Sequence, residues 1–413
     1  MNLYLFNDND SAAIYGIGTY LRELTCALEG ASINVHIVHL HSVRQKFEII
    51  KTGNVENWYI PEVTCENDSV DAIQLIENYF RNVINLLRIH IKDTNHLIFH
   101  FNFNNCYSLA RGLKAIFDCR TVAVVHYTKW GLELHDNLPR LRMIKTKPEK
   151  QRSSFEQMMY TANEYESSFF NEVDKVIALS HHMQSILISD YQIDADKITV
   201  IPNGLNDLNP TSVIDKEMLW RKWCLSEKEF IILFVGRFHS VKGLIFLIKA
   251  FRKVLEKFPH CRLMIAGNGN YDVYLREAKG ICTKITFTGL LEKVELCELY
   301  QIANVGVIPS LYEPFGYVAL EMMMYELPIV ATATSGLNEV VDDACGLKLP
   351  IIEYHDRVEV DTALLAEKII YLLQHPAEAR KIGQNGRKKY LNEYSSNVFK
   401  QNMLNFYNST YDT

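Results

Sequence analysis

Long apolar runs are missing from this sequence. No stretch approaches the ~18 consecutive apolar residues that a membrane-spanning helix requires. Residues 1–6 (MNLYLF) lead straight into residues 7–10 (NDND) without the basic flank of a signal peptide. We therefore expect a cytoplasmic protein.

Paired cysteines and an excess of positive charge are also missing. The nine cysteines are an odd number and include no Cys-x-x-Cys pair, which disfavours both a disulfide framework and a zinc site. Asp and Glu (49) outnumber Lys and Arg (43), and the net charge of −6 argues against a general nucleic-acid binder. We expect reduced thiols and neither a metal nor a nucleic acid as partner.

The composition is that of a packed globular protein, with 48% apolar and 22% charged residues. At roughly 100 to 200 residues per domain, a chain of 413 residues suits two domains.

Short runs rich in β-branched residues alternate with segments of helical spacing along the chain. This alternation predicts an α/β protein with parallel strands that helices cover on both faces. The runs are residues 3–6, 35–38, 97–99, 122–125, 176–179 and 198–201 in the first half, and 230–235, 263–266, 285–287, 305–308 and 329–331 in the second.

The best linker candidate is the turn-rich segment 202–210 (PNGLNDLNP). We therefore predict an amino-terminal domain of residues 1–204 and a carboxyl-terminal domain of residues 205–390. A final helical segment, residues 391–413, is free to pack back on the amino-terminal domain.

Two cations follow the predicted strand 230–235. Gly236-Arg237 and Lys242-Gly243 place them at a strand end where a helix begins, and ligands of open parallel sheets bind at such ends. Two cations beside the amides of a helix amino terminus suit a dianionic group such as a pyrophosphate. The alternative is that both side chains are merely solvated.

Two carboxylates follow the predicted strand 305–308. Glu313 lies in the strand-end loop, Pro314 and Gly316 precede a helix, and Glu321 falls in its second turn among Ala, Leu and Met residues. A carboxylate in apolar surroundings needs a specific hydrogen-bond donor. A ribose diol would supply one.

The spacing Glu313-x7-Glu321, together with Gly236-Arg237-x4-Lys242-Gly243, closely resembles the donor-site signature of the retaining glycosyltransferases of the GT-B fold, family 4. Further matching segments are residues 15–24 (YGIGTYLREL), 201–204 (IPNG), 266–269 (AGNG) and 335–341 (SGLNEVV). Their order extends the resemblance over most of the chain. Tyr15 departs from the family pattern, in which a second glycine is usual at this position.

The resemblance implies two Rossmann-like, doubly wound parallel-sheet domains that face a central cleft. It also implies that Glu313 and His126 are catalytic, with Glu313 positioning groups and stabilising charge rather than attacking as a nucleophile. The alternative for His126 is an ordinary hydrogen-bonded loop histidine. The implied donor-binding residues are Gly16, Arg237, Lys242, Gly269, Phe315, Gly316, Tyr317 and Glu321.

The implied reaction is the retaining transfer of a sugar from a nucleotide-sugar, without a metal or another cofactor. The expected acceptor is a cell-surface glycan or a lipid-linked sugar, and a protein or peptide is the second choice. A non-catalytic homologue that stabilises a partner transferase is a rival, although the intact charged residues argue against it. A phosphorylase would need a pyridoxal-binding lysine motif that the sequence lacks.

Three further segments resemble motifs for binding a metal, a dinucleotide or a membrane, and each has an alternative interpretation. Asp8-Asn9-Asp10 imitates a metal-binding Asp-x-Asp but has no acidic or histidine companions nearby. Residues 16–21 (GIGTYL) begin like a dinucleotide fingerprint, yet no acid follows the next predicted strand. Residues 138–152 hold six cations and one acid, which suits either a solvated acceptor-side loop or peripheral contact with the inner face of an anionic membrane.

Overall fold

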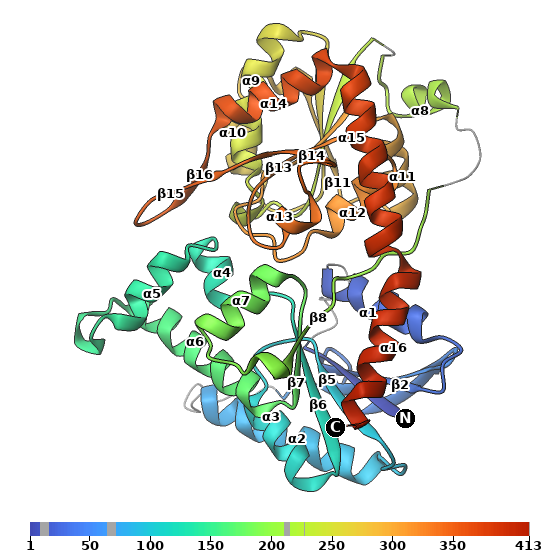
Figure 1. Ribbon diagram of the computed structural model, residues 1–413, viewed down its shortest axis with the longest axis vertical. Coiled ribbons are helices and arrows are strands. Elements are labelled where there is room, and N and C mark those ends of the chain that lie inside the picture. The colour runs from blue at the N-terminus through green and yellow to red at the C-terminus, as the bar shows by residue number, and fades with distance from the viewer. Residues whose placement is uncertain (9–15, 64–71, 210–214, 227, 413) are drawn as a thin grey trace. The chain divides into compact units, whose positions relative to one another are not determined.

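A computed structural model describes residues 1–8, 16–63, 72–209, 215–226 and 228–412 (Figure 1). The described chain forms two compact units. Unit 1 comprises residues 1–129, 144–204 and the segment from Ser396 onward, and unit 2 comprises residues 130–143 and 205–395. The boundaries drawn from the sequence, at residues 204 and 390, remain predictions.

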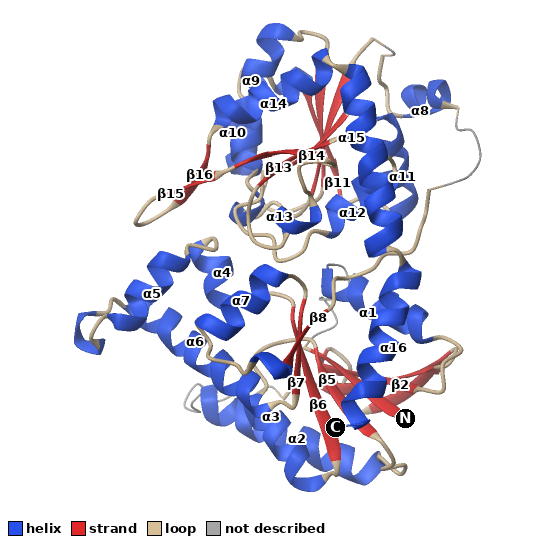
Figure 2. Ribbon diagram, in the orientation of Figure 1, coloured by secondary structure: helices blue, strands red, loops and turns tan. Residues whose placement is uncertain are grey.

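Eight strands form the sheet of unit 1, in the order β3-β4-β2-β1-β5-β6-β7-β8. Figure 2 draws the strands in red and the helices in blue. They are β1 (Asn2–Asn7), β2 (Asn34–Ser42), β3 (Glu48–Thr52), β4 (Val55–Pro61), β5 (Leu97–Phe101), β6 (Cys119–Val125), β7 (Lys175–Ala178) and β8 (Ile198–Val200). Neighbouring strands are parallel except β3 and β4, which form an antiparallel hairpin. The six strands predicted for this half are confirmed, and the hairpin was not predicted.

Helices α1, α2, α3, α6, α7 and α16 belong to unit 1, whereas α4 and α5 each have residues in both units. Their bounds are α1 (Gly16–Leu28), α2 (Ala72–His90), α3 (Tyr107–Ile116), α4 (Lys129–Leu134), α5 (Leu138–Thr146), α6 (Ser154–Glu172), α7 (His181–Ser189) and α16 (Ser396–Asp412). The carboxyl-terminal helix α16 packs on α1. Its Tyr407 Oη lies 2.9 Å from Nδ1 of the buried His100 on β5.

Six strands form the sheet of unit 2, in the order β11-β10-β9-β12-β13-β14, and every pair is parallel. They are β9 (Phe230–Val235), β10 (Cys261–Ala266), β11 (Ile285–Gly289), β12 (Val305–Ile308), β13 (Ile329–Thr332) and β14 (Gly346–Leu349). A separate antiparallel hairpin follows, made of β15 (Ile351–Glu353) and β16 (Val358–Val360). The five strands predicted for this half are confirmed, whereas β14 to β16 were not predicted.

The core of unit 2 lies between its sheet and the helices that cover it. Leu247 and Phe251 of α9 and Leu365 and Ile369 of α14 are fully buried there. The helices are α8 (Lys216–Lys222), α9 (Leu244–Lys257), α10 (Asp272–Glu277), α11 (Lys293–Ile302), α12 (Tyr317–Met324), α13 (Leu337–Val340), α14 (Thr362–Gln374) and α15 (Pro376–Lys389), followed by a π-helix (Tyr390–Tyr394).

The strand order of unit 2 reverses between β9 and β12. From β9 the chain proceeds to β10 and β11 on one side, and it then returns to β12, β13 and β14 on the other. The loops that leave β9 and β12 at their carboxyl ends therefore diverge, and such a switch point is where open α/β sheets bind ligands. Both charged motifs of the sequence follow these two strands.

Two absences concern only the described part of the chain. Within it, no helix combines the length and the apolar character needed to cross a bilayer. The eight cysteines that it includes are all free.

Candidate active site

The loop after β9 is built around Gly243. This glycine caps α9 with a φ of +66°, and a Cβ on it would lie 1.8 Å from the backbone oxygen of Pro309. Only glycine fits this close approach to the chain that leaves β12. The Leu311 N–H donates to the Val241 carbonyl at 2.7 Å and joins the two loops.

Two cations lie on this loop, with His239 between them in the sequence. Arg237 is exposed, and Lys242 is partly buried. The Nδ1 of His239 accepts a hydrogen bond from the Val241 N–H at 3.3 Å. Burial lowers the pKa of His239, and the charges of Arg237 and Lys242 lower it further. The loop thus presents two fixed positive charges beside a neutral imidazole.

Lys242 forms an ion pair with Glu313. Its Nζ lies 2.5 Å from Oε2 of Glu313, and the two side chains are only 22% and 16% exposed. Partial exclusion of water strengthens the attraction of such a pair. The Ser310 hydroxyl donates to the same oxygen at 3.4 Å. An anion that binds Lys242 must therefore share this lysine with Glu313.

The helix that follows Glu313 begins at the switch point. Gly316, the N-cap of α12, has a φ of +107°, and a Cβ there would lie 3.0 Å from Leu337 Cδ1. The Leu337 N–H donates to the Glu313 carbonyl at 3.1 Å. The amides of Phe315, Gly316 and Tyr317 stand at the helix start, where amides lack a carbonyl one turn earlier and attract anions.

Glu321 on α12 has a donor within the protein. The Tyr300 hydroxyl on α11 donates to Glu321 Oε2 at 2.6 Å. Tyr300 is 2% exposed, and its ring stacks on Tyr325 with the ring centroids 5.6 Å apart. Glu321 itself is only partly buried. The sequence did not indicate that Tyr300 belongs to the site, because a tyrosine on the apolar face of a helix is ordinarily part of the core.

Gly269 brings a third strand-end loop to the switch point. The Phe238 N–H donates to the Asn268 carbonyl at 2.8 Å. A Cβ on Gly269, which has a φ of +147°, would lie 2.7 Å from Phe238 Cβ. Gly269 therefore lets the loop after β10 pack closely against the loop that carries Arg237.

His126 follows β6, at the carboxyl end of the sheet of unit 1. Its Nε2 lies 3.2 Å from Asn102 Oδ1, and its ring meets the edge of Tyr20 with the centroids 4.7 Å apart. The Asn102 amide in turn donates to the Phe6 carbonyl at 3.1 Å. Burial lowers the pKa of His126 to about 3, so the ring is neutral near pH 7.

A buried carboxylate fixes the chain that follows His126. Glu166 accepts hydrogen bonds from the Tyr191 hydroxyl at 2.6 Å, the Lys129 N–H at 2.9 Å and the Asn104 amide at 3.2 Å. Burial raises the pKa of Glu166, although these donors oppose the shift. Sequence reasoning missed this residue too, because its partners come from three distant segments.

Gly16 is the exposed first residue of α1, and its contact with a donor phosphate stays a prediction. Tyr15, Asn9 and Asp10 lie outside the described residues. Among the residues that are described, no group of three or more His, Cys, Asp or Glu side chains is placed to hold a metal ion.

The basic segment 138–152 forms α5 and a short 3-10 turn. Lys145 Nζ donates to a backbone carbonyl at 2.5 Å, and Lys147 pairs with Glu156 at 2.8 Å. The guanidinium of Arg152 lies 3.6 Å from the centroid of a tyrosine ring. Within unit 2, Arg140 also donates to the Asp356 carbonyl at 2.7 Å. At least four of the six cations therefore bind protein groups, which favours a structural role for the segment.

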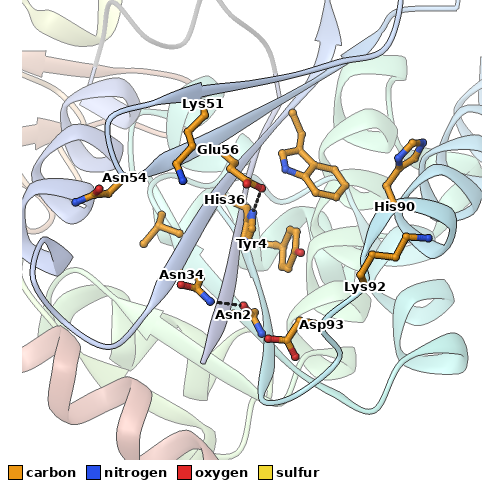
Figure 3. A pocket seen from close by; sticks show the side chains of 12 residues that line it. Asn2, Tyr4, Asn34, His36, Lys51, Asn54, Glu56, His90, Lys92 and Asp93 are labelled. Atoms are coloured by element: carbon orange, nitrogen blue, oxygen red, sulfur yellow. Dashed lines mark hydrogen bonds and ion pairs between the residues drawn. The ribbon is translucent and has the colours of Figure 1, made fainter.

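A polar cavity of about 370 Å³ lies in unit 1, away from the carboxyl ends of the strands (Figure 3). Its walls include Asn2 and Asn34, the first residues of β1 and β2. His36 Nδ1 lies 3.0 Å from Glu56 Oε2, and the Asn34 amide donates to Asn2 Oδ1 at 2.9 Å. Because these groups bind one another, we assign no ligand to this cavity.

Solved structures share the fold of the whole chain. A sucrose-phosphate synthase from Thermosynechococcus elongatus matches with a TM-score of 0.77 and 22% identity, covering 100% of this chain and 99% of that chain. Anabaena HepE in complex with UDP-glucose matches with a TM-score of 0.70 and 16% identity, covering 99% and 100%. The two parallel-sheet units are those of the GT-B fold, as predicted.

Family profiles match both halves of the sequence. Residues 14–207 match Glycosyltransferase Family 4, and residues 215–389 match Glycosyl transferases group 1. The chain belongs to this family of GT-B glycosyltransferases.

Two curated relatives illustrate the similarity. An uncharacterised glycosyltransferase of Methanocaldococcus jannaschii is 38% identical over 187 residues, which are 44% of this chain and 47% of the relative. The capsular polysaccharide biosynthesis glycosyltransferase CapM of Staphylococcus aureus is 28% identical over 242 residues, 57% and 61% of the two chains. The chain thus spans only about half the length of the curated relatives it matches.

Proposed function

We propose that this chain transfers a sugar from a nucleoside diphosphate sugar to a hydroxyl group of an acceptor. The Lys242–Glu313 ion pair at the switch point of unit 2 carries the proposal. There a cation, a carboxylate and the amino termini of α9 and α12 come together. The cation and the helix amides suit a diphosphate, and we assign the carboxylate to the donor sugar. The complex of Anabaena HepE with UDP-glucose supports a donor of this class.

Arg237 and Lys242 neutralise the diphosphate in this proposal. Negative charge grows on the departing phosphate as its bond to the anomeric carbon breaks, and cations and helix amides that are already in place stabilise that charge. We propose that no metal ion takes part. The transfer rate is then expected to be unchanged by a chelator such as EDTA.

We propose that the configuration of the anomeric carbon is retained. The bonding electrons leave with the phosphate oxygen, the acceptor oxygen bonds to the anomeric carbon on the same face, and the acceptor's proton passes to the departing phosphate. Glu313 is held by Lys242, so it serves as a positioning and charge-stabilising group rather than a nucleophile. Nuclear magnetic resonance of the product would reveal an inverted configuration if this is wrong.

Glu321 and the amides of Phe315, Gly316 and Tyr317 complete the proposed donor site. Glu321 accepts hydrogen bonds from the ribose, and the amides bind the donor sugar. We propose a cell-surface glycan or lipid-linked sugar as the acceptor, because CapM is named for capsular polysaccharide biosynthesis. Such an acceptor would be met on the cytoplasmic side of a membrane.

A thermal-shift screen tests the proposal. Wild-type protein is mixed with UDP, GDP or ADP, each alone and as its glucose conjugate. Binding to the native state raises the melting temperature, so one nucleotide is expected to raise it by several degrees in the wild type and not in Lys242→Ala. The absence of any shift in the wild type would contradict the proposed donor.

A further inference from the structure

Tyr300 is not among the site residues expected from the sequence. It nevertheless contacts Glu321, the carboxylate that we assign to the ribose. The distance between Tyr300 Oη and Glu321 Oε2 is 2.6 Å, within the range of about 2.5–2.7 Å for hydroxyl bonds to an ionised acceptor. An ionised carboxylate only accepts hydrogen bonds, and a phenol has one proton to donate. The proton of Tyr300 therefore points to Glu321.

Tyr300 is itself firmly held. Its side chain is 2% exposed and stacks on the ring of Tyr325 at an angle of 17°. Burial, together with the charge of Glu321, raises the pKa of Tyr300 well above its ordinary value. Its hydroxyl therefore stays protonated and keeps donating throughout the physiological pH range.

Little room for water remains beside this bond. A cavity of about 10 Å³ is lined by Tyr300, Glu321, Tyr325 and neighbouring side chains, and a volume near 10–15 Å³ is about the least that holds one water. On this side, the Tyr300 hydroxyl donates directly to the carboxylate at 2.6 Å. A carboxylate has roughly four acceptor positions, and the Tyr300 hydroxyl takes one of them.

A glutamate side chain is flexible, and ordering it when a ligand binds costs conformational entropy. A hydrogen bond that orders it beforehand raises affinity because that cost is already met. We propose that Tyr300 is a positioning residue that holds Glu321 ready for the two ribose hydroxyls and thereby makes unit 2 prefer ribonucleotides to their dideoxy analogues. This inference rests on the proposed function, since it takes Glu321 to bind the ribose.

A cycle of variants and ligands tests the inference. Wild type, Tyr300→Phe, Glu321→Ala and the double variant are titrated calorimetrically with the nucleoside diphosphate, among UDP, GDP and ADP, that stabilises the wild type most. Each is also titrated with the 2′,3′-dideoxy analogue. Tyr300→Phe is expected to weaken ribonucleotide binding by about tenfold and to leave binding of the analogue unchanged. In the Glu321→Ala background it should have no further effect.

Two further variants separate positioning from packing. Tyr325→Phe removes the hydroxyl of the stacked neighbour but leaves the Tyr300–Glu321 bond, so its affinity should stay within about twofold of the wild type. Tyr300→Met lacks the donor at similar volume and should behave like Tyr300→Phe, which keeps the test open if the phenylalanine variant fails to fold.

The outcomes that would overturn the inference are distinct. A wild type that binds the ribonucleotide and the dideoxy analogue equally removes the ribose role of Glu321, and the inference falls with that part of the proposed function. A wild type that prefers the ribonucleotide, with Tyr300→Phe showing the same preference, overturns the role of Tyr300 alone. A loss of affinity for both ligands to the same degree would reduce Tyr300 to a packing residue.

Discussion

The carboxyl ends of the two sheets differ in their chemistry although the sheets are built alike. In unit 2, the loops at this edge carry Arg237 and Lys242 with Glu313. In unit 1, the side chains at this edge include the neutral pair His126 and Asn102. Because similar scaffolds carry both sets, the difference lies in the loops. Among the described residues, the strand ends of unit 2 gather two cations with a carboxylate. Those of unit 1 combine the neutral pair with Asp8, which follows β1 and lies 4.0 Å from Nε2 of His41 on β2.

The largest effect is expected from removing the cations of unit 2. Lys242→Ala and Arg237→Ala should each lower the transfer rate by at least about a hundredfold, because each withdraws a preformed charge from the departing diphosphate. Release of the nucleoside diphosphate measures the rate, and circular dichroism checks that the fold is intact. Lys253→Ala, at an exposed position of α9, is the matched control. Near-normal turnover in both variants would remove the phosphate assignment.

A smaller effect is expected from replacing Glu313, where affinity for the nucleotide should rise while the transfer rate falls. In Glu313→Gln the carboxylate no longer competes for Lys242, so affinity for the free nucleoside diphosphate should rise by about threefold to tenfold. The transfer rate should nevertheless fall by about tenfold or more, since the carboxylate is lost from the sugar side. Calorimetric binding and initial rates measure the two quantities. A parallel loss of binding and rate would show that Glu313 only supports the local fold.

The neutral His126 of unit 1 predicts a response to acid. His126 has a pKa of about 3 in the native state, against about 6.5 when unfolded. The unfolded chain therefore takes up the proton first, and stability falls as the pH drops from about 6.5 toward 3, by at most about 1.4 kcal/mol per pH unit for one histidine. Scanning calorimetry at pH 7 and pH 5 should show a smaller decrease in melting temperature for His126→Asn than for the wild type. Equal decreases would mean that His126 takes up its proton as readily in the native state as in the unfolded chain.

Sequence reasoning found the strands of both sheets wherever a strand is a short apolar run buried on both faces, as β1 and β9 are. It missed the β3–β4 hairpin, whose strands have half-exposed and polar positions. The two-residue turn Gly53-Asn54 between them was a usable signal. Strands β14 to β16 each include a charged residue, Lys348, Glu353 and Glu359 respectively, so none of them is an unbroken apolar run.

The candidate site was predicted as motifs but not as contacts. The glycines at positions 243 and 316 mark close approaches of backbone that a local pattern already suggests. The bond between Lys242 and Glu313 joins residues 71 apart, and it follows from the strand order rather than from either motif. Tyr300 carries no local sign of its role, because its hydroxyl on α11 meets Glu321 on α12 only in the folded chain.

The smallest effect is expected at the basic segment 138–152. An exposed cation adds only about 1 kcal/mol of attraction to an anionic membrane, and Lys145, Lys147 and Arg152 already have partners in unit 1. In sedimentation with phosphatidylglycerol vesicles at low salt, Lys150→Ala, at an exposed position, should weaken binding by no more than about fivefold. Strong binding that is lost in a Lys145→Ala/Lys147→Ala variant would instead show that these cations leave their contacts for lipid. The contrast between Lys242 paired with Glu313 in unit 2 and the neutral His126 in unit 1 would then remain, because it does not depend on this segment.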